Sequence, residues 1–194
     1  IQAPVFILWG TIVMCGVVVE AHRVFDTVPT ELAYVAMAVT GLVATIISRV
    51  HHVALPVFVG TLGMSFGSFA LDYPSPVFPY LVIILCLANI FATYATRLLR
   101  ASWLRWMLLF TTHFMLQIWG LKLSGLLSRG NAAEHLSPDW FIPIVTLIGG
   151  TFMLISLLGI IRSGDDKISK FDFSLPAVNA GWCYVAGIYA LKDP

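Results

Sequence analysis

Two polar side chains that could do chemistry stand four residues apart in an otherwise apolar stretch of the sequence. The stretch FTTHFMLQIWG, residues 110–120, contains His113 and Gln117. Residues four apart share one face of a helix, so the imidazole and the carboxamide would point the same way. Together they could pass a proton or a solute, and the imidazole alone could ligate a cofactor. This pair is the first candidate site.

A third polar side chain, Asn89, lies in the middle of the preceding apolar stretch. The short connector RLLRA predicts an antiparallel hairpin that places Asn89 about one helical turn from the depth of His113. An amide or imidazole in hydrocarbon is costly unless it is paired. We therefore expect Asn89, His113 and Gln117 to form one intramembrane polar cluster. A structural hydrogen bond, a proton or solute pathway and a cofactor ligand are the three interpretations left open.

The composition places this cluster in a membrane. Of the 194 residues, 59% are hydrophobic and 11% are charged, and the mean hydropathy is +0.90. Soluble domains carry about 25% charged residues. The net charge of +1 comes with no basic tract, so no nucleic acid is expected as a partner. The lipid bilayer, with bound lipid, is the partner expected first.

Seven apolar segments approach the length of about 20 residues that a helix needs to cross a bilayer. They are residues 3–21, 31–48, 53–71, 77–96, 102–121, 140–161 and 175–191. The sequence RVHH alone separates the second from the third, which predicts a tight hairpin. The seventh is the weakest because it is short and contains Asn179. The chain is thus predicted to be an all-α, polytopic integral membrane helical bundle of about seven transmembrane helices in one domain, residues 1–194.

Basic residues in the short loops predict the orientation, because cytoplasmic loops are enriched in lysine and arginine. The side that holds the loops after the second, fourth and sixth segments carries Arg49, Arg97, Arg100, Arg105, Arg162, Lys167 and Lys170. The other side carries Arg23, Lys122, Arg129 and Lys192. We therefore expect a multi-pass protein of the cell's inner (cytoplasmic) membrane with its N-terminus in the cytoplasm.

Small residues recur on the helix faces where close packing would need them. Helices in lipid associate by close approach, which glycine and alanine permit. The third segment contains a GxxxG pair, and the fourth and seventh have small residues on one face. The candidate packing residues are Gly63, Gly67, Ala88, Ala92 and Gly181. Internal helix packing and an intersubunit face are the two interpretations.

Five histidines require that haem be considered. A haem ligated by two histidines needs both imidazoles at one depth, and His113 alone is central. No cofactor is therefore predicted, although a haem held by His113 with another type of ligand, or a quinone, stays an alternative. The acidic and histidine residues near the outer loops match no metal motif, so no metal site is predicted. No GxSxG, HExxH or P-loop sequence is present.

Four consecutive segments between residues 52 and 120 share a layout with known proteins. They are the glycine-containing LPVFVGTLGMSFGSFAL, then FPYLVIILCLANIFA, then the basic RLLRASWLRW, and finally FTTHFMLQIWG. This third of the chain resembles a family of bacterial membrane proteins catalogued as domain of unknown function 2339. The resemblance implies a bacterial, polytopic, helical protein. It brings no established activity and no site residues, and members of the family are longer, with more spans.

These patterns predict a non-catalytic integral membrane subunit or scaffold within a larger membrane protein assembly. Other membrane subunits, or further copies of the chain, are its expected partners. A transporter or channel with a polar site at His113, Gln117 and Asn89 is the second interpretation. A redox membrane subunit that binds haem or quinone is the third. No catalytic residue is predicted, and an enzymatic activity is the weaker expectation.

Overall fold

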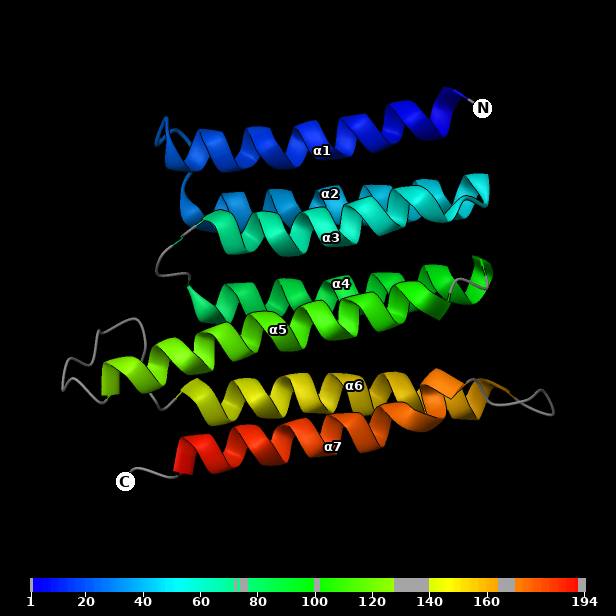
Figure 1. The fold of residues 1–194 in the computed structure, drawn as a ribbon. Coiled ribbons are helices and arrows are strands. Elements are labelled where there is room, and N and C mark those ends of the chain that lie inside the picture. The colour runs from blue at the N-terminus through cyan, green and yellow to red at the C-terminus, as the bar shows by residue number, and fades with distance from the viewer. Residues whose placement is uncertain are drawn as a thin grey trace. The chain divides into compact units, whose positions relative to one another are not determined.

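The computed structural model is all α-helical, which confirms the predicted class (Figure 1). It describes residues 2–71, 73, 77–99, 102–127, 140–163 and 170–191. The helices are α1 (Gln2–Arg23), α2 (Thr30–His51), α3 (Ala54–Leu71), α4 (Phe78–Leu99), α5 (Ser102–Leu127), α6 (Phe141–Ser163) and α7 (Lys170–Leu191). Each overlaps one predicted segment. The largest differences are that α5 continues to Leu127 and that α7 begins at Lys170, with Pro176 inside it.

Five of the described helices are long and apolar enough to cross a membrane. Their membrane-spanning stretches are Val5–Arg23, Thr30–His51, Ala54–Leu71, Phe78–Ala95 and Phe141–Ile161. The chain is thus a helical protein with several candidate spans, and the passage of α5 and α7 through the membrane stays a prediction.

The chain divides into two compact units, residues 1–112 and 113–194, with the boundary inside α5. The first unit contains α1 to α4 and the beginning of α5. The second contains the rest of α5 together with α6 and α7. The predicted organisation as one domain stays a prediction. Within the first unit, Arg105, which the orientation argument treats as a loop cation, lies inside α5 and is buried.

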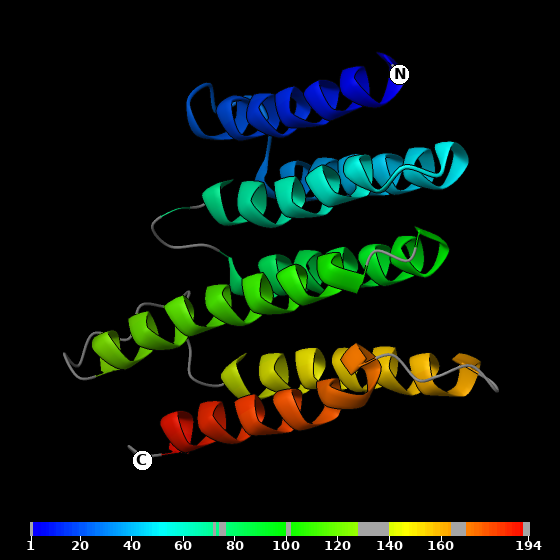
Figure 2. The ribbon, with the colours of Figure 1, turned by 45° about the vertical axis from the view of Figure 1, so that its right-hand side comes forward.

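Helix α3 is the centre of the first unit, where it packs against α1, α2 and α4 (Figures 1 and 2). Its buried face is made largely of small residues, including Thr61 and Ser65. The Thr61 hydroxyl donates to the Val57 carbonyl at 2.6 Å, and the Ser65 hydroxyl donates to the Thr61 carbonyl at 2.8 Å. Because each hydroxyl bonds to the preceding turn of its own helix, it can be buried without a partner on another helix.

Glycines set how closely α3 approaches its neighbours. A Cβ added at Gly60 would lie 2.4 Å from the Ala44 Cβ of α2. On the α1 side, a Cβ at Gly63 would lie 3.1 Å from the Cys15 sulfur. A Cβ at Gly67 would lie 2.8 Å from the Met37 methyl of α2. The GxxxG pair therefore lies at helix contacts inside the first unit, and Ala88 and Ala92 of α4 are buried there as well.

A two-residue turn joins α2 to α3, as the short RVHH connector predicts. His52 takes a left-handed backbone conformation with φ of 53°, and its N–H caps the Ser48 carbonyl. The Ser48 hydroxyl accepts a hydrogen bond of 2.7 Å from the Val57 N–H in the first turn of α3. One serine thus serves the end of α2 and the start of α3, which fixes the hairpin.

The Gly60 contact gives a direct test of this packing. Replacing Gly60 by alanine should lower the free energy of unfolding, because the Ala44 Cβ cannot move without separating α2 from α3. The expected loss is about 1–3 kcal/mol, the usual range for overpacking. Unfolding of the purified protein in mixed micelles, followed by circular dichroism, measures it.

Gly10→Ala is the matched control, because nothing lies within 4 Å of the position that its Cβ would take. The free energy of unfolding of this variant should equal or exceed that of the parent protein. Equal stability of the Gly60→Ala and Gly10→Ala variants would contradict the close approach of α2 and α3.

Candidate functional site

Three helices of the second unit each contribute one face to the candidate site. The residues on each face are three or four positions apart, so they lie along one side of a helix. They are His113, Leu116, Gln117 and Gly120 of α5, Phe141, Val145, Gly149 and Phe152 of α6, and Asn179, Trp182, Cys183 and Ala186 of α7. The site therefore depends on the packing of α5, α6 and α7 within this unit.

The His113 ring lies between two aromatic rings. Its centroid is 5.4 Å from that of Phe152, with the planes 23° apart, and 4.7 Å from that of Trp182, with the planes 87° apart. Stacked and edge-on arrangements at these distances are the favourable ones for aromatic pairs. The Nε2 atom of His113 is buried. The imidazole thus behaves here as one member of a three-ring cluster.

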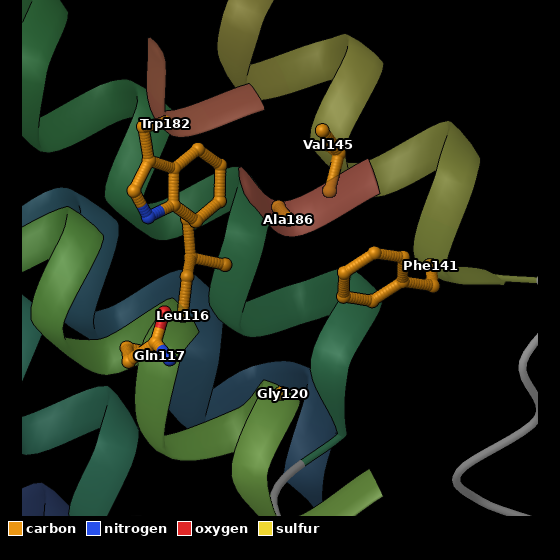
Figure 3. A pocket seen from close by; sticks show the side chains of 7 residues that line it. All are labelled: Leu116, Gln117, Gly120, Phe141, Val145, Trp182 and Ala186. Carbon is orange, nitrogen blue, oxygen red and sulfur yellow. The ribbon is translucent and has the colours of Figure 1, made fainter. Parts of the chain in front are cut away.

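A small cavity lies one turn along α5 from the three-ring cluster (Figure 3). Its lining residues are Leu116, Gln117, Gly120, Phe141, Val145, Trp182 and Ala186. The volume is about 20 Å³, enough for about one water molecule. Gln117 supplies the amide of this mostly apolar lining. A porphyrin bound here would need the helices to separate and the contacts of His113 with Phe152 and Trp182 to be given up.

Asn179 makes the polar contact between α6 and α7. Its amide Nδ2 donates to the Gly149 carbonyl at 2.9 Å, and the Cys183 thiol donates to its Oδ1 at 3.8 Å. Asn179 is buried. A Cβ at Gly149 would lie 3.0 Å from the Cys183 sulfur, so glycine is what lets the two helices approach this closely.

The role of Gly181 as a packing residue of α7 stays a prediction, because an intersubunit face is one of its two interpretations. Gly181 has nothing within 4 Å of the position that a Cβ would take. The close approach of α6 and α7 is at Gly149 instead, where α7 presents Asn179 and Cys183. The signal in the sequence was Asn179 itself, because an amide in an apolar segment needs a partner.

In the first unit, Asn89 has its own partner on the next helix. Its Nδ2 lies 2.8 Å from the Leu85 carbonyl and 2.8 Å from the Thr112 hydroxyl oxygen, and donates to both. Asn89 and Thr112 are both buried. An interhelical hydrogen bond from Asn89 to α5 was expected, but sequence reasoning missed Thr112 as its acceptor. The contact of Asn89 with His113 stays a prediction.

The buried face of α5 is not centred on His113 and Gln117. The four-residue spacing predicts that these two side chains point the same way, into one polar cluster. In the structure Phe110 and Gln117 are exposed, whereas Leu108, Thr112 and Met115 are buried. The buried face is therefore centred near Thr112, and His113 lies at its edge.

Metal-binding groups were sought among the described residues. No group of three or more histidine, cysteine, aspartate or glutamate side chains there could hold a metal ion. His22 Nδ1 lies 2.8 Å from the Val28 carbonyl oxygen, so this imidazole makes a hydrogen bond to the loop between α1 and α2. Of the acidic and histidine residues near the outer loops, which match no metal motif, Asp72, Glu134, His135 and Asp139 lie outside the described residues.

Comparison with known proteins adds no assignment. No protein-family model matches the chain, and no curated protein or solved structure matches it significantly. The resemblance of residues 52–120 to the bacterial family therefore stays a prediction, and function has to be argued from the geometry.

The three-ring cluster predicts different effects of two substitutions at His113. His113→Phe should keep the stability of the protein, because a phenyl ring can make both aromatic contacts. His113→Ala should lower the free energy of unfolding by about 1–3 kcal/mol, since two ring pairs are lost. Unfolding in mixed micelles measures both.

Phe114→Ala is the control, because this neighbouring ring is exposed and should contribute little. If His113→Phe destabilised the protein as much as His113→Ala, the imidazole nitrogens would be the essential groups, and a ligand role for His113 would gain support.

Proposed function

We propose that the chain is a non-catalytic integral membrane subunit that packs within a larger membrane assembly. The observation that carries this proposal is the way the buried amides are used. Asn89 bonds to Thr112, and Asn179 bonds to the Gly149 carbonyl. The first bond joins two helices of the first unit, and the second joins two helices of the second unit. These two asparagines thus hold helices together, which is the expected use of such groups in a packing protein.

The outer surface of α1 supports the same proposal. Phe6, Trp9, Val13 and Val17 follow each other at helical spacing and are all exposed. In a membrane this face contacts either lipid or another apolar helix. Because α1 buries only a narrow stripe against α2 and α3, much of its surface is left for a partner subunit or for lipid.

The assembly is tested by native mass spectrometry of the protein released from its own membranes in mild detergent. We expect a species heavier than the 21.3 kDa chain. Its mass should correspond either to this chain with other membrane subunits in a whole-number ratio or to a whole number of copies of this chain. Crosslinking in the intact membrane before extraction guards against loss of weak partners. A single uncomplexed chain under both conditions would contradict the proposal.

A transporter or channel is the second candidate, and the exposure of Gln117 at the small cavity favours it. Transport needs water to reach this amide. In a background with Cys15, Cys86 and Cys183 replaced by alanine, Gln117→Cys should then react with a charged, water-soluble thiol reagent in intact membranes.

Phe114→Cys is the matched control one turn away, because Phe114 is an exposed apolar residue that should face lipid. The packing proposal expects both cysteines to stay unmodified. Fast reaction at residue 117 but not at residue 114 would favour transport.

A further inference from the structure

An open groove lies between α2 and α4 in the first unit. Its lining residues are Leu42, Thr45, Ile46, Arg49 and Val50 of α2 and Ile90, Phe91 and Tyr94 of α4. Its volume is about 580 Å³, within the range of about 300–1,000 Å³ that is usual for ligand sites. Both helices are candidate membrane spans, so the groove opens where lipid chains would lie.

The lining of the groove is apolar over most of its length. Leu42, Ile46 and Arg49 are three or four residues apart and share one side of α2. The Thr45 hydroxyl donates to the Gly41 carbonyl at 2.8 Å, so its hydrogen-bonding capacity is used inside its own helix. A ligand in this part of the groove therefore meets hydrocarbon, not polar groups.

A fixed cation closes one end of the groove. Arg49 is exposed in the last turn of α2, and its guanidinium lies 5.2 Å from the centroid of the Tyr94 ring. Arg49 Nη1 also donates a hydrogen bond to the Tyr94 hydroxyl. Two contacts with one tyrosine hold the guanidinium in place. Because a guanidinium has five N–H groups, this arrangement leaves donors to recognise a ligand.

The acidic residues described in the first unit are far from this cation. Glu20 lies in the last turn of α1, Asp26 lies in the following loop, and Glu31 is in the first turn of α2. Arg49 is eighteen residues beyond Glu31 on the same helix, a rise of roughly 27 Å. The described acids of this unit therefore do not neutralise Arg49, and the groove end has a positive charge that suits an anion.

We propose that this groove binds one anionic phospholipid, with an acyl chain along the apolar lining and the phosphate on Arg49. A guanidinium can bind two phosphate oxygens at once, which a single ammonium cannot do. Arg49 and Tyr94 are both near helix ends, at the depth where arginine and tyrosine meet lipid headgroups. The proposal depends on membrane insertion of α2 and α4 and not on the assembly role.

Lipid retention measured by native mass spectrometry tests the proposal. The delipidated protein in mild detergent is mixed with equal amounts of phosphatidylglycerol and phosphatidylcholine. The parent protein should retain one phosphatidylglycerol in preference to phosphatidylcholine. Arg49→Gln should lower this retention about fivefold, the size expected when one basic residue is removed from an anionic lipid surface.

Arg23→Gln is the matched control. Arg23 is also an exposed arginine in the last turn of a span, but it contacts the Tyr73 carbonyl and lies away from the groove. This variant should keep the parent's lipid preference. Unchanged retention in Arg49→Gln, or equal losses in both arginine variants, would overturn the proposal.

Ile46→Trp tests the apolar part without changing the charge. The larger side chain should fill the groove and lower the retention of both lipids. Inorganic phosphate added at millimolar concentration should not displace the lipid, because it has no acyl chain. Full displacement by phosphate would show an anion site without a chain site and would overturn the proposal. A chain that proved to be monomeric would still be expected to bind the lipid, so the two proposals fail independently.

Discussion

Polar groups inside a membrane helix must find partners within the protein, because hydrocarbon offers none. Two ways of doing so occur in the described helices. On the buried face of α3, the Thr61 and Ser65 hydroxyls bond back to their own helix. The longer amides reach a neighbour, so Asn89 bonds to Thr112 and Asn179 bonds to the Gly149 carbonyl. The first kind permits burial without fixing a partner, whereas the second decides which helices meet and at what rotation.

A hydrogen bond from a side chain to the backbone of another helix needs the two helices to come close, and glycine permits this. Asn179 can reach the Gly149 carbonyl because Gly149 has no side chain, and a Cβ there would press on Cys183. Gly60 likewise lets the Ala44 Cβ of α2 approach α3 closely, at a contact that is apolar. Small residues therefore set the spacing, and the amide adds direction where a carbonyl is within reach.

The apolar length and the short RVHH connector were enough to predict the helices and the hairpin between α2 and α3, because both depend on local sequence. The rotation of α5 was not predictable in this way. A helical wheel groups residues that share a face, but it does not say which face is buried. The wheel gave weight to His113 and Gln117 as the most polar residues, yet Thr112 is the residue that Asn89 bonds. The same limit applies to the small residues: many occur in the spans, and which of them meets a neighbour depends on tertiary packing.

The two hollows described above differ in what they offer another molecule. The cavity beside Gln117 has room for about one water, and the neighbouring imidazole is occupied with Phe152 and Trp182. The groove at Arg49 is far larger and apolar, and it ends in a guanidinium that Tyr94 holds in place. Binding energy in a lipid environment comes from charge and from fixed geometry more than from apolar contact, since lipid tails are as apolar as the helices. By that argument Arg49 is better placed than His113 to recognise something outside the chain.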